Sequence, residues 1–267
     1  MLKTIKAVFE KENISRVGFL RIDDCDIINE RILPEFAKSV VLFCIPYRST
    51  AELPTDGFSE YSRVYDYHDF SKQLYERIVP ELYKLTGCKF SGFCDHSPIN
   101  EKLAAVKSGL GFVGRNSLFF DEVYGSFVFI GSLICDIEFD VKPEEIRTCS
   151  NCGLCVERCP NSAILGRGID RYKCLSGISQ KKTKTNEEIT LLKEHNIVWG
   201  CDICQLVCPH NINAKISPIP YFSETRIKHI DKDFIMALSD EEFSKYAFAY
   251  KGRKIVINNM EFNNFIT

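Results

Sequence analysis

The sequence predicts an α/β or α+β domain, then a small cysteine-rich module, and finally a short helical tail. Three observations support this fold class. Apolar, β-branched runs alternate with segments of helical periodicity in the first part of the chain. Eight of the 13 cysteines lie between residues 149 and 208, and apolar residues recur at helical spacing after them. The expected division is 1–145 for the sheet domain, 146–215 for the module, and 216–267 for a helical segment that packs on the core.

The elements of the sheet domain follow from local patterns. The first sixteen residues, "MLKTIKAVFEKENISR", form an amphipathic pattern that predicts a helix. Short apolar runs predict strands at 17–22, 39–47 and 89–95. Helical spacing predicts helices at 69–85 and 100–111, and the glycines of the second would end it. The run 116–139 predicts two strands paired around a turn.

Composition excludes several classes of protein. The net charge is −2, so a contact with nucleic acid would need a local basic patch. No apolar run reaches the length of a membrane span, which is about 18 residues, and the N-terminus lacks the pattern of a signal peptide. We therefore expect a cytoplasmic monomer with no membrane contact.

The cysteines are too many and too uneven for a disulfide framework. Their number is odd, and thiols in the cytosol stay reduced. Five of them are scattered among apolar residues, where inert thiols are expected: Cys25, Cys44, Cys88, Cys94 and Cys135. The other eight form a separate group with regular spacing.

The stretch "CSNCGLCVERCP" has the spacing of a bacterial ferredoxin. In such a run the first three cysteines bind one four-iron cluster and the fourth binds the other. The reciprocal rule applies to the second stretch, "CDICQLVCP", whose last cysteine would complete the first cluster. The predicted ligands of the first cluster are Cys149, Cys152, Cys155 and Cys208.

The second cluster then lacks one thiolate. Cys159, Cys201 and Cys204 supply three ligands, and Cys174 is the only cysteine left between the two groups. We assign Cys174 as the fourth ligand. Structural zinc is the alternative, since eight cysteines could hold two zinc ions, but the ferredoxin spacing favours iron and sulfur. Two neighbouring clusters indicate electron transfer, so the chain catalyses a reduction or, as a ferredoxin-like carrier, supplies electrons to one.

Several motifs, most of them outside the module, resemble the epoxyqueuosine reductase family. They are "SRVYDYH" (62–68), "CDHSPINEKLAAVKSGLGFVGRNSLFF" (94–120), "GSFVFIGSLICD" (125–136), "GCDICQLVCPHN" (200–211) and "YKGRKIVINN" (250–259). The resemblance covers about residues 15 to 260. Ferredoxins contain neither the Asp-x2-Pro turn nor the Gly-Leu-Gly-x2-Gly segment of these motifs.

The resemblance implies a cobalamin-dependent, iron–sulfur oxidoreductase that acts on tRNA in the last step of queuosine synthesis. It implies cobalamin bound in the base-off state beside two [4Fe-4S] clusters, in a sheet domain like those of nitroreductase-like and cobalamin-processing proteins. Electrons would come from an external donor such as a flavodoxin or ferredoxin. The alternative is a paralogue with the same cofactors and a different, smaller substrate. Many family members continue into a helical-repeat domain that helps to grip tRNA, whereas this sequence ends at Thr267.

The resemblance also assigns site residues. Asp95 would be the general acid, a carboxyl held neutral beside the apolar corrin and able to protonate the epoxide oxygen. The positions expected to contact cobalamin are Asp95, Phe119, Ile130 and Ser176. Lys102 matches a position that faces tRNA. His68, in "DYHDF", has two interpretations, a residue of the helix start or a neighbour of substrate or cofactor.

Overall fold

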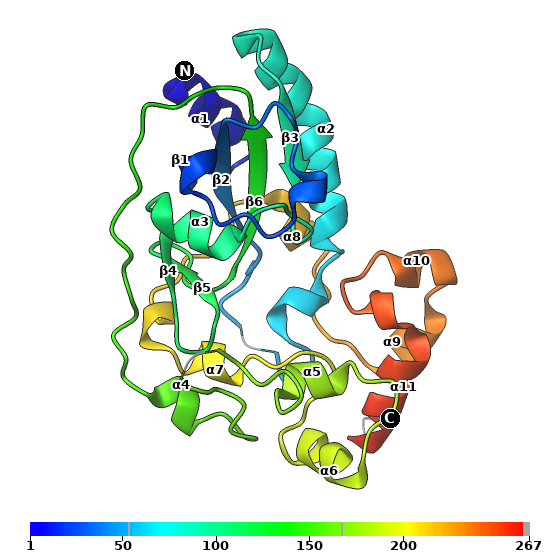
Figure 1. Ribbon diagram of the computed structural model, residues 1–267. Coiled ribbons are helices and arrows are strands. Elements are labelled where there is room, and N and C mark those ends of the chain that lie inside the picture. Colours follow the sequence, from blue (N-terminus) through cyan, green and yellow to red (C-terminus); the bar gives the residue numbers. More distant parts are fainter. Residues whose placement is uncertain (53, 167, 264–267) are drawn as a thin grey trace.

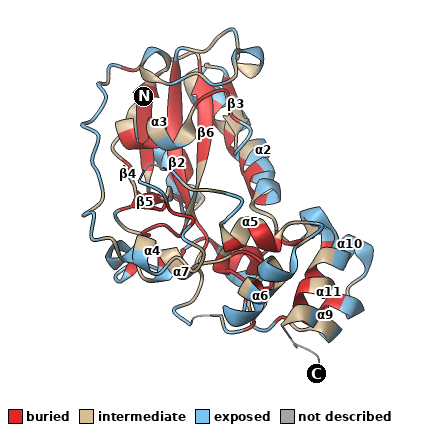
Figure 2. Ribbon diagram, turned by 60° about the horizontal axis from the view of Figure 1, so that its bottom comes forward, coloured by how far each residue is buried: buried red, intermediate tan, exposed pale blue. Residues whose placement is uncertain are grey.

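A four-stranded antiparallel sheet forms the centre of the N-terminal domain in this computed structural model, which describes residues 1–52, 54–166 and 168–263 (Figure 1). The strands, in sheet order, are β1 (Val17–Arg21), β2 (Ser39–Pro46), β6 (Val128–Cys135) and β3 (Phe90–Phe93). The predictions of strands at 17–22, 39–47 and 89–95 are confirmed. All eight residues of β2 are buried, as its apolar run predicts for a strand covered on both faces (Figure 2).

The two faces of the sheet carry separate apolar cores. One face packs against α1 (Leu2–Lys11) and α2 (Tyr67–Thr86), with Val41, Phe43 and Ile45 of β2 in this core. The other face packs against α3 (Glu101–Lys107), with Val40 and Leu42 in that core. The alternation of β2 side chains divides them between the two cores. The three helices were predicted from helical spacing, and they are confirmed.

The prediction of two strands paired around a turn within 116–139 is wrong. Its first strand, β5 (Phe119–Asp121), pairs with β4 (Gly111–Val113) in a separate two-stranded sheet. Its second strand, β6, lies between β2 and β3 and pairs along its whole length with β2. In the middle of the larger sheet, the apolar side chains of β6 are buried or half-buried. Its pairing partners, β2 and β3, are distant from it in sequence.

The cysteine-rich module is built from loops and short helices below the sheet domain in the view of Figure 1. Its elements are α4 (Leu154–Glu157), α5 (Leu175–Ser179), α6 (Asn186–Glu194), α7 (Ile203–Leu206) and the 3-10 turn η4 (Pro209–Asn211). The side chain of Asn211 ties the module to the sheet domain. It donates to Ser126 Oγ and to Gln205 O, at 2.8 and 2.7 Å, and accepts from the Ser126 backbone N–H at 2.8 Å.

The C-terminal segment is helical, as predicted, and forms a third core with the module. Its elements are α8 (Pro220–Glu224), α9 (Lys232–Ala237), α10 (Asp240–Ser244), the 3-10 turn η5 (Ala249–Lys251) and α11 (Arg253–Phe262). Ser239 and Glu242 form a capping box at the start of α10. Phe248 and Val256 pack with the fully buried Trp199 of the module.

A buried ion pair also joins the segment after β2 to this tail. The guanidinium of Arg63 donates to Asp56 and to the carbonyl of Ile227, and both charged side chains are almost fully buried. The remaining 3-10 turns are η1 (Ile22–Asp24), η2 (Glu30–Ile32) and η3 (Glu60–Arg63). Within the described ranges, no helix has the length and apolar character needed to cross a bilayer.

Candidate functional site

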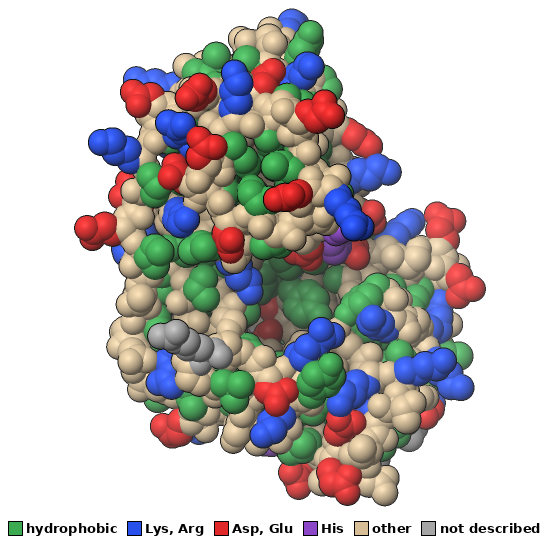
Figure 3. Space-filling view, viewed as in Figure 1, with side chains coloured by type: hydrophobic (Ala, Val, Ile, Leu, Met, Phe, Trp, Pro, Cys, Tyr) green, Lys and Arg blue, Asp and Glu red, His purple; other side chains and the backbone are tan. Residues whose placement is uncertain are grey.

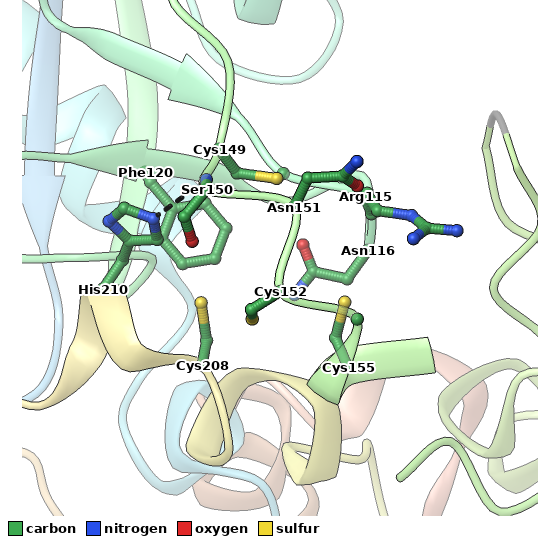
Figure 4. Close-up of a pocket in the computed structure, with 12 residues that line it drawn as sticks. Arg115, Asn116, Phe120, Cys149, Ser150, Asn151, Cys152, Cys155, Cys208 and His210 are labelled. Carbon is green, nitrogen blue, oxygen red and sulfur yellow. Dashed lines mark hydrogen bonds between the residues drawn. The ribbon is translucent and has the colours of Figure 1, made fainter. Parts of the chain in front are cut away.

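The four cysteines predicted for the first cluster surround one cavity. Cys149, Cys152 and Cys155 approach it from the loop before α4 and from α4 itself, and Cys208 approaches from the end of α7. Figure 4 shows the four side chains around a common space. His210 closes one side of it, with its ring 4.7 Å from the ring of Phe112 in an edge contact.

The four cysteines predicted for the second cluster also come together. Burial raises the pKa of the Cys204 thiol to about 12, and the neighbouring thiols of Cys174 and Cys159 contribute to this shift. Burial likewise raises the pKa of Cys201 to about 12, with contributions from Cys204 and Cys174. Cys174 therefore lies near Cys201 and Cys204 despite its separation in sequence, and Cys159 lies near Cys204.

The donor sets fit iron–sulfur clusters better than single ions. Each set consists of four thiols, the ligands of [4Fe-4S] clusters. Among the residues that the structure describes, no three Cys, His, Asp or Glu side chains converge closely enough to hold one metal ion. A zinc ion would need its sulfur ligands at about 2.3 Å. In the described part of the chain, the thiols of each set are therefore not gathered around the position of a single ion.

The five scattered cysteines take no part in either set. Cys44 and Cys135 are buried, and Cys25, Cys88 and Cys94 are half-buried. Burial raises the pKa of Cys25, Cys94 and Cys135 to about 12, so these groups are protonated thiols at neutral pH.

A large cavity of about 740 Å³ lies between the sheet domain and the module. Figure 3 shows a hollow in the middle of this face of the molecule. The volume is in the range of small-molecule and cofactor sites, about 300–1,000 Å³. Three thiols of the second cysteine set line its module side: Cys174, Cys201 and Cys204. Leu118, Val128 and Phe129 line the sheet-domain side.

Opposed carboxylates and an imidazole form a polar corner of this cavity. Asp66 caps the N-terminus of α2, and Tyr67 and His68 are the first residues of that helix. Asp95 follows β3 and reaches the same corner. Nδ1 of His68 lies 2.7 Å from Oδ1 of Asp66, and its Nε2 lies 3.5 Å from Oδ2 of Asp95. The hydroxyl of Tyr67 donates to the same Asp95 oxygen, and its ring stacks on Phe129 at 3.8 Å.

The electrostatics of this corner place the exchangeable proton on His68. Hydrogen bonds to Asp66 and then to Asp95 raise the pKa of His68 to about 10. Burial raises the pKa of Asp95, but hydrogen bonds from His68 and Tyr67 outweigh it, and the pKa lies below its usual value. Burial also raises the pKa of Asp66, and its bonds to His68 again reverse the direction. The corner is an imidazolium held between two carboxylates.

This arrangement corrects one expectation and leaves others open. The prediction that Asp95 is held as a neutral acid is wrong for this state, because His68 and Tyr67 stabilise its anionic form. Ser176 and Asp95 line the large cavity, as expected for contacts with a cofactor. Phe119 and Ile130 are not among the lining residues. Both pack in the core beneath α3, and the neighbouring Leu118 and Phe129 face the cavity instead.

Lys102 lies near the polar corner and outside the cavity lining. Its ammonium donates to the carbonyl of Ser117 at 2.7 Å. Burial lowers its pKa, while the charge of Asp95 acts in the opposite direction. A contact with tRNA at this residue stays a prediction.

Sequence reasoning missed Tyr67 and Asp66 as site residues and left His68 undecided. The signal was present in "DYH", which places a helix cap and two ring side chains at one helix start. It gave no indication of the partner, because Asp95 lies 28 residues away from Tyr67 in sequence.

Comparisons with known proteins agree with this site. A family model described as "4Fe-4S double cluster binding domain" matches residues 148–211. The epoxyqueuosine reductase of Cyclobacterium marinum is 33% identical over 231 residues, which are 82% of this chain and 72% of that protein. That of Leadbetterella byssophila is 35% identical over 195 residues, 70% of this chain and 63% of the relative.

Solved structures share the fold. Epoxyqueuosine reductase from Streptococcus thermophilus superposes with a TM-score of 0.81 at 23% identity, over 98% of this chain and 80% of that one. A crystal structure of epoxyqueuosine reductase with an epoxyqueuosine-modified tRNA-Tyr stem loop gives a TM-score of 0.80 at 22% identity, over 98% and 81%. The reductive dehalogenase NpRdhA gives 0.53 at 14% identity, over 85% and 34%. The α/β fold with an added iron–sulfur module is therefore confirmed, and the chain belongs to the epoxyqueuosine reductase family of oxidoreductases.

Proposed function

We propose that this chain reduces epoxyqueuosine in tRNA to queuosine, with cobalamin in the large cavity and two [4Fe-4S] clusters in the module. One observation carries the proposal: a single cavity has cluster thiols on one wall and a proton-bearing corner on another. Reduction of an epoxide to an alkene needs two electrons and two protons and releases water. The cavity brings a path for the electrons and a source of protons to one place.

The eight cysteines would divide between the clusters as their positions indicate. The first set includes Cys152, which is exposed, so electrons from an external donor such as a flavodoxin or ferredoxin would enter on that side. The second set lines the large cavity and would deliver electrons there. Cobalamin, bound base-off, would supply these electrons for cleavage of the epoxide C–O bond. Leu118, Phe129 and Ser176 are the residues placed to hold it.

The polar corner would supply protons to the oxygen that leaves. Asp95 is ionised and accepts from Tyr67, and the His68 imidazolium lies against the same oxygen. Because Asp95 is ionised, the proton for the substrate oxygen would start on His68 and pass through the Asp95 carboxylate, while the other nitrogen of His68 stays bound to Asp66. Asp95 is then the group that touches substrate, and His68 is the donor of the proton that Asp95 transfers.

The chain's own partner would be tRNA that carries epoxyqueuosine. A related structure contains such a stem loop. Another relative, from Bacillus subtilis, has its catalytic loop swung out of the active site. We infer that the Asp95 turn of this chain also has an open position.

The test begins with the chain reconstituted under anaerobic conditions. We expect about eight irons per chain, a spectrum of bound cobalamin, and conversion of epoxyqueuosine-containing tRNA when a chemical reductant supplies electrons. Asp95→Asn should keep both cofactors and lose turnover by at least about 100-fold. The matched control is Asp69→Asn, an exposed carboxylate on the same helix as His68 that should have normal activity.

Two results would contradict the proposal. A chain that binds iron but has no affinity for cobalamin would not be a reductase of this type. A fully loaded chain that leaves epoxyqueuosine in tRNA unchanged would act on another substrate, as a paralogue of the family.

A further inference from the structure

The turn that carries Asp95 is conformationally costly. Asp95 has a backbone φ of +60°, in the left-handed region that side chains other than glycine avoid. Such a residue costs on the order of 1 kcal/mol and persists only when its surroundings hold it. Burial does not hold it, because the Asp95 side chain is 61% exposed. Tyr67 and His68 hold the Asp95 carboxylate, and a further contact holds the backbone of the turn.

Glu101 supplies that contact from behind the turn. It is the first residue of α3, and its Oε2 accepts a hydrogen bond from the Asp95 backbone N–H at 3.2 Å. Its other oxygen, Oε1, accepts from the hydroxyl of Ser132 at 2.8 Å. One carboxylate thus joins the exposed turn to the interior of the sheet.

The far end of this link is rigid. Ser132 is fully buried in β6, where it lies opposite Leu42 of β2 and Phe93 of β3. Because β6 is hydrogen-bonded on both sides, the position of the Ser132 hydroxyl is fixed by the sheet. Any shift of the Asp95 turn would have to break the bond to Glu101 or move α3.

The environment of Glu101 is unfavourable for a charge. Burial raises its pKa to about 7, the hydrogen bonds from Ser132 and Asp95 act in the opposite direction, and the charge of Asp95 adds to the increase. The titratable groups that face it from neighbouring elements are Tyr75 of α2 and Cys94 at the end of β3, which are neutral, and Asp95. A half-buried acid in such surroundings needs a role that an apolar side chain could not perform.

We propose that Glu101 is a positioning residue that clamps the strained Asp95 turn to β6 and so keeps the Asp95 carboxylate against Tyr67 and His68. The effect on catalysis rests on the proposed function. The clamp itself does not, and it is measurable in the chain without substrate. Glu101 touches neither the cavity nor the reacting atoms, since it is absent from the cavity lining.

The first measurement is amide hydrogen exchange by mass spectrometry on the cluster-loaded chain. Glu101→Ala should speed exchange of a peptide covering 94–98 by about tenfold, because it removes a hydrogen bond to a partly charged acceptor. Glu101→Gln keeps an amide oxygen for the Asp95 N–H and should stay within about threefold of the wild type. Ser132→Ala removes only the anchor and should give an intermediate rate. The control is Glu187→Ala, a glutamate in the first turn of α6 on the surface.

The second measurement follows His68. When the turn opens, Asp95 leaves the imidazole, so the pKa of His68 should fall in Glu101→Ala and be restored in Glu101→Gln. In turnover, Glu101→Ala should lower kcat at least tenfold with an unchanged KM for tRNA, as expected when the reacting group is misplaced and binding is intact.

Unchanged exchange at 94–98 in both Glu101→Ala and Ser132→Ala would overturn the proposal. So would faster exchange spread evenly over the sheet domain in Ser132→Ala and Glu101→Gln, because that pattern means a general loss of stability. Failure of the proposed function looks different: the turn would loosen in Glu101→Ala, while the fully loaded wild-type chain would leave epoxyqueuosine in tRNA unchanged.

Discussion

Replacing His68 by glutamine should change how the stability of the chain depends on pH. The imidazole is held between Asp66 and Asp95, at 2.7 and 3.5 Å, and its pKa is raised to about 10. From a usual value of about 6.5, this shift corresponds to at most about 5 kcal/mol. The His68 side chain is 52% exposed, so solvent screening reduces the net effect to about 1–2 kcal/mol.

The sign follows from the direction of the shift. A group whose pKa is raised in the folded state binds its proton more tightly there, so His68 contributes its full stabilisation below about pH 6.5. The contribution declines as the pH rises and is lost once the pH passes about 10. The difference between the wild type and His68→Gln should therefore be largest near pH 6 and disappear above pH 10.

Thermal unfolding of the cluster-loaded chain at several pH values measures this difference. For a chain of this size, each kcal/mol moves the unfolding midpoint by about 2–4 °C. The control is His195→Gln at the C-terminus of α6, a histidine outside the cavity lining. A constant offset between the wild type and His68→Gln from pH 6 to 10 would refute the reasoning, as would an NMR titration of His68 near pH 6.5.

Two further predictions concern the metal and the core. Cys174→Ala should lower bound iron from about eight to about four per chain, whereas Cys88→Ala should leave it unchanged; loss of no iron would remove Cys174 from the ligands. Asp56→Ala should lower the free energy of unfolding by about 3–5 kcal/mol in chemical denaturation, because it leaves the buried guanidinium of Arg63 without its carboxylate. A change below about 1 kcal/mol would mean that Arg63 finds another partner.

The parts of the fold that follow from local patterns were predictable. The runs that became β1, β2 and β3 have strand composition over their own length, and α2 has its apolar stripe and its cap. The placement of β6 was not predictable, since its partners lie more than thirty residues away and pair through backbone groups that every residue carries. The local sequence pattern specifies that a segment forms a strand, whereas the strand with which it pairs depends on the whole sheet.

The site shows the same division. The grouping of Cys149, Cys152, Cys155 and Cys208 around one cavity could be inferred from spacing, because cluster geometry constrains which thiols are neighbours. Cys174 was assigned because no other cysteine remained between the two groups, and its role as a ligand stays a prediction. The charge state of Asp95 could not, because it depends on Tyr67 and His68, which only the fold brings to it. Phe119 was assigned by its position in a motif, but its side chain packs in the core and the preceding residue, Leu118, lines the cavity.

The contact made by Asn211 has a consequence for how the chain assembles. This side chain lies three residues after Cys208 and bonds to Ser126, and its amide oxygen would be 2.1 Å from any β-carbon at position 125, where the chain has glycine. We therefore expect Cys208, the predicted last ligand of the first cluster, to reach its place only when the module docks onto the folded sheet domain. We expect cluster insertion to come late in maturation, so that a chain with an unfolded N-terminal half would carry an incomplete, oxygen-sensitive iron centre.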